Sequence, residues 1–447
     1  MSKRYRQWTP EQVWLFPPSP RDWLPEGHLV YFLMDVVGQI DIAPIFAHYE
    51  KSQQGQPPFH PRMMLTLLLY AYCGGVYSSR KIMARCESDA AFRVIVGGDV
   101  PDFRTISDFR KIHLPTMKAV FVEVLRLCAE AGLVKVGRLA LDGTKIKANA
   151  SRHKAMSYDR MTQEEQRLQR EIAELLARAE ATDDAEDERH GRDRTGDELP
   201  AELSRRESRL QKIQEAKAAL EEQARQKARA HAAQLEAEGG TPRKNPEDAM
   251  PKEKDQRNFT DPESKIMKTS NKGFDQCGNA QAVANEQQVI VAADVTNQAN
   301  DVRQVQPMIE QTQTNLKAAG VEDTPRGFLA DAGYFSEENV KTTKASGMDP
   351  FIATQRLKHT EAIPESPKGR IPWDLSAKQR MARKLRTKKG RETYSKRKWM
   401  IEPVFGQIKA CRHFLHFQLR GLQQMQGEWD LVCLTHNLLK LYRTATA

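Results

Sequence analysis

Cysteines, aromatic residues and long apolar runs are all scarce in this sequence. Its 447 residues include six cysteines without a Cys-X-X-Cys pair, so we expect reduced thiols and neither a zinc site nor a disulfide framework. The most apolar run, residues 63–72, is about half as long as a bilayer span requires. The N-terminal residues contain no apolar signal core. These absences argue against an exported or membrane-spanning protein and predict a cytoplasmic one.

Positive charge, by contrast, is in excess. The chain carries 69 Lys and Arg against 59 Asp and Glu, for a formal net charge of +10. This balance suits a polyanionic partner such as nucleic acid, although many basic proteins bind none. The length predicts about three domains of about 150 residues each.

Residues 1–135 predict a helical N-terminal domain. Apolar residues recur at helical spacing in four segments: 28–40, 61–73, 78–94 and 115–131, with Pro61 and Pro115 as first-turn residues. A turn and a short helix at 97–111, together with the helix before them, resemble a helix-turn-helix in outline. Its candidate DNA contacts are Arg80, Lys81, Arg85, Arg104 and Arg110. An equally weighted alternative is a small bundle whose basic residues form a solvated face.

A strand pattern follows at residues 138–150. Leu139 and Leu141 alternate with polar or small residues in the period of two of a β-strand, and Gly143 allows a close backbone approach. Asp142 therefore lies among apolar neighbours. A lone buried carboxylate costs several kcal/mol, so Asp142 needs a basic partner, a hydrogen-bond network or a metal ion.

Residues 152–262 are strongly charged and nearly free of aromatic side chains. Apolar residues step by three and four in two runs: Leu168, Ile172, Leu175 and Ala179, then Leu203, Leu210, Ile213 and Leu220. An acidic, turn-prone segment at 183–200 separates the runs. This pattern predicts a coiled-coil-like helical hairpin, inserted as an arm into a domain that has begun but not finished. An arm of this kind most often serves as a scaffold or a dimer contact.

Short strands and helices alternate after the arm. The patterns predict a hairpin of strands at 281–284 and 289–295, a helix at 302–319, a strand at 327–331, a helix capped by Ser336 and a strand at 350–354. Asp331 ends the fourth strand of this set, whose first strand contains Asp142. Asp294 ends the hairpin and Asp301 is expected to cap the next helix, so we interpret both as structural.

The chain then becomes very basic. Between residues 378 and 398, eleven of 21 residues are Lys or Arg, and Glu392 is the single acid. Such a density is typical of a solvated run or of a phosphate-binding strip, and its position favours the strip, with Lys388, Lys389, Arg391 and Arg397 as DNA contacts. Glu402 follows directly and is flanked by apolar residues. Two amphipathic segments end the chain, and His436 there is expected to be a core histidine.

Three acids in apolar settings beside a basic strip indicate metal chemistry. Two carboxylates about 4 Å apart repel by about 4 kcal/mol at an effective dielectric near 20, whereas a shared divalent cation attracts both. Mg²⁺ prefers oxygen ligands and is typically held by one or two carboxylates with substrate phosphate completing its shell. A pair of such ions can support an in-line phosphoryl displacement. We therefore predict metal-assisted chemistry on nucleic-acid phosphodiesters.

The motifs resemble a known family. Asp142 in LALDGTKIKANAS, Asp331 in FLADAGYFSEEN and Glu402 in WMIEPVFGQIK look like the DDE triad of bacterial insertion-sequence transposases with an RNase H-like catalytic domain. The resemblance extends to the N-terminal stretch PDFRTISDFRK and so covers nearly the whole chain. It implies that the three acids bind two Mg²⁺ ions, which Mn²⁺ can replace, and that water and then a 3′-hydroxyl act as nucleophiles.

The resemblance also implies helper residues of a Tyr-Arg-Glu-Lys branch. In that branch an Arg lies four residues before the Glu, a Tyr lies three before the Arg, and a Lys follows the Glu by seven. Lys409 fits. Lys398 stands four before Glu402, whereas Arg397 and Tyr394 have the right mutual spacing but lie one position early. Helical phase places Lys398 roughly 40° from Glu402 and favours it; Pro403 can kink the helix there, so Arg397 stays an alternative.

The sequence thus predicts an α/β fold with an RNase H-like mixed-sheet core, a helical insertion and an all-α N-terminal domain. The predicted domains are a DNA-binding domain at 1–135, a catalytic domain at 136–151 and 263–412, the insertion at 152–262 and a C-terminal helical segment at 413–447. The predicted function is DNA transposition by a homodimer or larger synaptic complex, acting on double-stranded element ends and target DNA in the bacterial cytoplasm, at the nucleoid.

Other interpretations stay open at this point. The chain could be a domesticated, catalytically inactive DNA-binding regulator, or a structural scaffold built on its arm. Asp142 could be bonded to Lys145 or to a turn of the backbone. Asp331 could be an ordinary helix cap, and Glu402 an ion-pair partner of Lys398.

Overall fold

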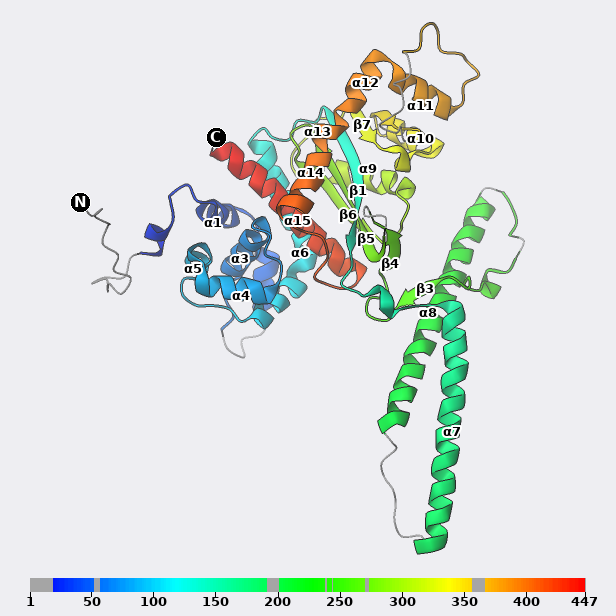
Figure 1. Ribbon diagram of the computed structural model, residues 1–447. Helices are drawn as coiled ribbons and strands as arrows, with labels where there is room; N and C mark the ends of the chain where they lie inside the picture. Colours follow the sequence, from blue (N-terminus) through cyan, green and yellow to red (C-terminus); the bar gives the residue numbers. More distant parts are fainter. Residues whose placement is uncertain are drawn as a thin grey trace, which may run out of the picture.

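The computed structural model describes residues 19–51, 57–190, 201–237, 239–242, 244–269, 273–355 and 366–446. Helices surround a mixed sheet, and a long helical arm extends away from this body (Figure 1). The predicted α/β class, with a mixed-sheet core, a helical insertion and a helical N-terminal region, is confirmed.

The sheet is built around β1, the strand that holds Asp142. Its strands are β1 (Arg138–Lys147), β4 (Lys265–Lys268), β5 (Phe274–Asn285), β6 (Ile290–Thr296), β7 (Gly327–Ala330) and β8 (Asp349–Ile352). The order is β4-β5-β1-β7-β8, with β6 paired to β5. Strand β1 is antiparallel to β5 and parallel to β7. Every strand predicted between residues 138 and 354 is present, and β5 begins earlier than its predicted start because its polar first half also pairs with β1 and β4.

Three helices pack against strands of the sheet: α9 (Val305–Ala318), α10 (Glu337–Ala345) and α15 (Leu422–Ala445). Helix α15 packs on β6 and on the N-terminal helices. Its Trp429 is fully buried and donates its indole N–H to the carbonyl of Gln281 in β5 at 2.9 Å. Ser336 caps α10 by accepting from the backbone N–H of Asn339 at 2.9 Å, as predicted.

The N-terminal helices are α1 (Leu29–Gln39), α2 (Ala43–Tyr49), α3 (Pro61–Cys73), α4 (Ser79–Ser88), α5 (Ala90–Val96) and α6 (Phe103–Glu130). The single helix predicted at 78–94 is wrong, because Asp89 takes an extended conformation that ends α4 and its side chain caps α5. The described residues also contain short 3-10 turns: η1 (Pro20–Trp23), η2 (Arg152–Lys154), η3 (Pro246–Asp248), η4 (Val302–Gln304) and η5 (Ala332–Tyr334).

Helix α6 also differs from the prediction. Pro115 lies inside it rather than in a first turn, and the short helix expected near residue 104 is its beginning, capped by Asp102. An interior proline costs about 3 kcal/mol. One continuous stripe of buried residues, including Ile106, Met117 and Val124, offsets that cost by packing the helix into the core.

One hydrophobic core spans the body of the molecule. Buried side chains of the N-terminal helices, the sheet and α15 form a single contiguous cluster that runs from Val30 to Leu441. The N-terminal helices therefore share their core with the sheet, although they precede it in sequence.

The arm consists of α7 (Tyr158–His190) and α8 (Ala201–Ala237), which lie side by side and antiparallel (Figure 1). Residues 183–190 of the predicted turn belong to α7, and residues 191–200 lie outside the described residues, as do the side chains of Ala179 and Leu203. Leu168, Ile213 and Leu220 are buried in a second, small core. The short strands β2 (Ala155–Ser157) and β3 (Gln256–Asn258) pair at the base of the arm.

Helices α11 (Ala377–Arg386), α12 (Lys388–Ser395), α13 (Arg397–Met400) and α14 (Glu402–Gly406) carry the basic segment toward α15, followed by the π-helical turn η6 (Gln407–Cys411). Within the described chain, no single helix is both long and apolar enough to cross a membrane; the bent pair α1–α2 passes only when its two helices are counted together.

Candidate active site

Sheet register places Asp142 beside Asp331. Leu141 of β1 lies opposite Ala330 of the parallel strand β7, and each is followed directly by one of the two acids. Paired positions on neighbouring strands point to the same face of a sheet. Burial raises the pKa of Asp142 to about 6; Arg397 opposes this shift, and the nearby charge of Asp331 adds to it.

Arg397 joins Glu402 to this pair. Its Nη2 atom lies 2.7 Å from Oδ2 of Asp142, and its Nη1 atom lies 3.3 Å from Oε1 of Glu402. Burial lowers the pKa of Arg397, but Asp142, Tyr394 and the other two acids together raise it above its usual value. Arg397, whose side chain is 12% exposed, thus contacts Asp142 and Glu402 directly and lies close enough to Asp331 for the charge of that acid to act on it.

A break in the helix decides which basic residue faces the acids. Pro403 has no N–H to donate to the carbonyl of Trp399, and the side-chain amide of Gln288 donates to that carbonyl instead, at 2.7 Å. Helix α13 ends at Met400 and α14 begins at Glu402. The helical-phase prediction for Lys398 is therefore wrong: Arg397 contacts the acids, and Lys398 is exposed.

Lys409 reaches the same face of β1. It lies in η6, and its Nζ atom donates to Oγ1 of Thr144 at 3.0 Å. Thr144 is two residues after Asp142, so both side chains point to one face of the strand. The structure thus places Lys409 close to the acids.

A polar network behind the acids was missed at the sequence level. Asp301 does not cap the following helix. Its Oδ1 atom accepts from Lys145 (3.0 Å), Asn279 (2.6 Å) and Gln281 (3.0 Å), and Gln281 in turn accepts from the hydroxyl of Tyr334. Lys145 is therefore the partner of Asp301 and not of Asp142. The signal in the sequence was the pair Asn279 and Gln281, two polar residues two apart among the otherwise small or apolar residues 277–284 of β5.

Gly143 is required by this network. A Cβ atom at this position would lie 2.3 Å from Nε2 of Gln281 and 3.0 Å from the hydroxyl of Tyr334. The prediction of a close approach at Gly143 is confirmed.

Asp331 also has a structural role. Its Oδ1 atom accepts from the backbone N–H of Gly333 at 2.8 Å and so caps the short turn η5. Capping through one oxygen fixes the direction of the carboxylate beside Asp142.

The donor set suits a divalent cation by its chemistry, since carboxylate oxygens are the preferred ligands of Mg²⁺. As the side chains stand, no three acidic, His or Cys groups in the described residues form a ready metal site. Arg397 lies between Asp142 and Glu402, and the Glu402 side chain is 51% exposed and can turn. Asp142 and Asp331 are the adjacent pair that could hold an ion, with Glu402 completing the set.

The predicted DNA contacts divide into two groups. Arg80, Lys81, Arg85 and Arg104 are exposed on α4 and α6, and Lys388, Lys389 and Arg391 are exposed on α12. Arg110 is 5% exposed, so the prediction that it lies on an exposed face is wrong. Part of the basic strip serves the fold itself, since Arg383 donates to the carbonyls of Lys368 (3.0 Å) and Gly369 (2.8 Å).

Two known families match parts of the chain. Residues 18–112 match the family described as "Transposase domain (DUF772)", and residues 241–438 match the family described as "Transposase DDE domain". The chain belongs to the DDE-type insertion-sequence transposases. No curated protein and no solved structure matches it. Transposases of this family generally use divalent metal ions.

The two matches leave part of this transposase uncovered. Asp331 and Glu402 lie within the second match, whereas Asp142 lies between the two matches. The arm falls within the same gap and separates β1 from the strands that β1 pairs with in the sheet.

Proposed function

We propose that this transposase binds the ends of its own insertion element and cuts and joins DNA there, with Asp142, Asp331 and Glu402 as metal ligands. The observation that carries this proposal is the convergence of three carboxylates from distant segments around Arg397. The metal is Mg²⁺, which Mn²⁺ can replace, and two ions are bound.

The residues of the chain have distinct roles in this proposal. When bound, the ions activate the attacking oxygen and stabilise the leaving oxygen of the phosphodiester. Asp142 and Asp331 are held by the sheet, and Glu402 turns from Arg397 to join them. Lys409, next to Thr144, and Arg397, once released from the acids, bind the scissile phosphate. Water and then a 3′-hydroxyl act as nucleophiles.

We assign Tyr394, Arg397, Glu402 and Lys409 to the Tyr-Arg-Glu-Lys set of the branch. The chain has one residue more than the branch between the Arg and the Glu. The break between α13 and α14 accommodates this extra residue and leaves Arg397 against the acids.

The remaining assignments follow from the same function. Residues 1–135 bind DNA, 136–151 and 263–412 carry out the chemistry, 152–262 form an inserted arm and 413–447 close the core. The active form is a homodimer or larger synaptic complex at the bacterial nucleoid. An inactive regulator is disfavoured, because the acids and Lys409 are all retained and assembled.

The test is strand cleavage of a plasmid that carries the DNA flanking this reading frame. The wild-type protein is expected to nick this DNA with Mg²⁺ and not with Ca²⁺ or a chelator. Asp142→Asn is expected to bind the DNA and not cut it, while Asp294→Asn, a matched change on β6, cuts normally. Nicking by Asp142→Asn at the wild-type rate would refute the proposal, and wild-type binding without cleavage in any divalent ion would favour the regulator.

A further inference from the structure

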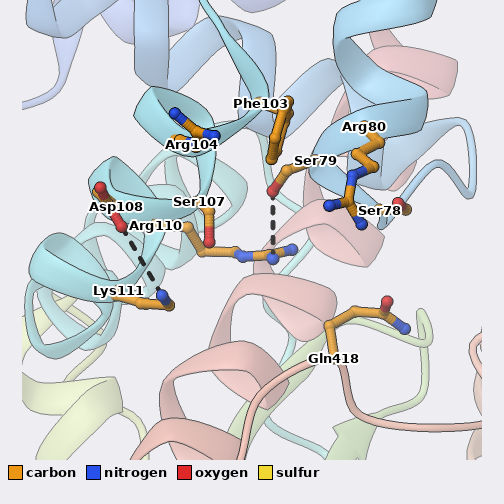
Figure 2. Close-up of a pocket in the computed structure, with 10 residues that line it drawn as sticks. All are labelled: Ser78, Ser79, Arg80, Phe103, Arg104, Ser107, Asp108, Arg110, Lys111 and Gln418. Atoms are coloured by element: carbon orange, nitrogen blue, oxygen red, sulfur yellow. Dashed lines mark hydrogen bonds and ion pairs between the residues drawn. The ribbon is translucent and has the colours of Figure 1, made fainter.

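A polar cavity of about 460 Å³ lies away from the acids, between α4, the beginning of α6 and the loop that holds Gln418. Four cationic side chains line it, against the single acid Asp108: Arg80, Arg104, Arg110 and Lys111. Figure 2 shows Arg110 extended beneath Ser79, with Arg80 and Lys111 on either side and Gln418 opposite. The cavity therefore carries a strong positive field.

Arg110 keeps its charge although it is buried. Its guanidinium donates to the carbonyl of Tyr77 (2.7 Å), the hydroxyl of Tyr72 (3.1 Å) and Oγ of Ser79 (3.4 Å), all of which are neutral. Its Nε atom has no hydrogen-bond partner among the described residues. The buried carboxylate of Glu428 accepts from the hydroxyl of Tyr72 at 2.8 Å, and within the described residues it makes no direct hydrogen bond with Arg110. A buried cation with neutral acceptors is stabilised by an anion in the adjoining cavity.

Two further cations are held at the cavity by one aromatic ring. The guanidinium carbons of Arg80 and Arg104 lie 4.7 and 5.5 Å from the ring centre of Phe103. The Ser78 side chain, at the beginning of α4, makes no capping hydrogen bond within the described chain. Backbone N–H groups of the first turn of α4 and three serine hydroxyls thus supplement the cations, a donor set that suits phosphate oxygens.

We propose that this cavity binds one phosphodiester group of the DNA backbone, independently of base sequence. The proposal rests on the proposed function, since it names a contact that a DNA-bound transposase makes outside its active site. Phe103, the aromatic residue of the cavity, is engaged by Arg80 and Arg104, so phosphate rather than a base is recognised. A second cavity of about 380 Å³, lined by Lys81 and Arg85, continues the positive surface along α4 and suits an extended polyanion.

The cavity is also connected to the active-site strand. The backbone N–H of Gln418 donates to Glu428 at 2.8 Å, and the carbonyl of Gln418 accepts from Asn149, just beyond β1, at 2.6 Å. A phosphate held in the cavity therefore fixes the DNA relative to the strand that carries Asp142, which is how backbone contacts set the register of a duplex.

The experiment measures DNA affinity against salt concentration in a chelator, so that cleavage plays no part. Arg80→Gln, Lys111→Gln and Ser107→Glu are compared with Lys212→Gln, an exposed lysine on α8 of the arm, by fluorescence anisotropy with a flanking-DNA duplex and a duplex of unrelated sequence. Arg110 is left intact because it is buried in the core, and thermal unfolding verifies the fold of each variant.

Each pocket variant is expected to weaken binding to both duplexes equally and to lower the slope of log affinity against log salt by about 1, while Lys212→Gln leaves the slope unchanged. Slopes equal to that of the wild type in all three pocket variants would overturn the cavity proposal alone. Stabilisation of the wild-type protein alone by inorganic phosphate, with unchanged DNA slopes, would also overturn it and indicate a small-anion site. A wild-type protein that binds neither duplex would instead overturn the proposed function.

Discussion

Nη2 of Arg397 lies 2.7 Å from Oδ2 of Asp142. This carboxylate oxygen is the one that Asp142 would offer to a metal ion. The same guanidinium contacts Glu402 through Nη1. A cation of the chain thus neutralises the acids, which would otherwise repel one another. A divalent ion and Arg397 compete for the same oxygens, and this competition can be measured.

Arg397→Gln is expected to raise the affinity of the protein for Mn²⁺ and to lower the nicking rate. The affinity rises because the competing cation is gone, and the rate falls by about 100-fold or more because a charged contact to the phosphate is lost. Isothermal titration with Mn²⁺ and single-turnover nicking measure the two effects.

Lys398→Gln is the matched control for Arg397→Gln. Since Lys398 is exposed, both its Mn²⁺ affinity and its nicking rate are expected to stay near the wild-type values. The reverse result, with nicking lost in Lys398→Gln and kept in Arg397→Gln, would contradict the role given to the helix break.

Gly143→Ala is expected to destabilise the protein by about 1–3 kcal/mol and to abolish nicking. The new methyl group would meet the amide of Gln281, which Asn279, Asp301 and Tyr334 hold in place. Urea unfolding and the nicking assay measure the two effects.

Gly38→Ala is expected to change the stability of the protein in the opposite direction. Gly38 lies in α1 and a Cβ atom there would have nothing within 4 Å, so alanine is expected to stabilise the folded protein by about 0.5–1 kcal/mol.

An undisturbed nicking rate in Gly143→Ala would show that the Gln281 network does not support Asp142.

Asp430→Asn is expected to stabilise the protein at pH 8 far more than at pH 5. Burial raises the pKa of Asp430 to about 7, from an ordinary 3.8. Between these values the folded state holds a proton that the unfolded state has released, so the stability contributed by this group is lost as the pH rises toward 7. Asparagine does not ionise and can still accept from Gln426.

The difference between the two pH values should amount to about 3 kcal/mol. Melting temperatures of the variant and the wild type at pH 5 and pH 8 measure it. A stabilisation that is equal at both pH values would mean that Asp430 is not protonated in the folded protein.

Leu220→Ala is expected to loosen the arm and leave the sheet unchanged. Leu220 belongs to the small core that α7 and α8 share, and that cluster is separate from the main core. Loss of a buried leucine side chain costs about 2–5 kcal/mol, enough to open a small helical pair. Hydrogen exchange should rise within residues 158–237 and stay constant in β1 and β5; a rise in all of them would show that the arm and body unfold together.

Local patterns were sufficient to predict most of the elements. The alternation around Leu139 and Leu141 identified β1, and the helical spacing of Leu168, Ile213 and Leu220 identified the arm, because each pattern reports which face of one element is buried. His436 was correctly predicted as a core residue: it contacts Gln407 at 2.7 Å and the carbonyl of Gln288 at 2.9 Å.

Features that depend on distant residues could not be predicted. Pro403 indicates a kink, but the carbonyl of Trp399 is satisfied by Gln288, which lies in a turn between two strands. Nothing near residue 400 therefore indicates which basic residue faces the acids after the break. Asp301 looked like a helix cap because its partners come from elsewhere: Lys145 lies opposite Asn279 only in the register of β1 and β5. Arg110 looked exposed because its acceptors, Tyr72 and Tyr77, precede it by more than thirty residues.

Helix α15, residues 422–445, packs at once on α3, on α6 and on β6. Without these last turns, the apolar surfaces of the amino-terminal helices and of the sheet that α15 covers would be exposed to water. A chain truncated before Leu422 is therefore expected to aggregate instead of folding into a shorter soluble form.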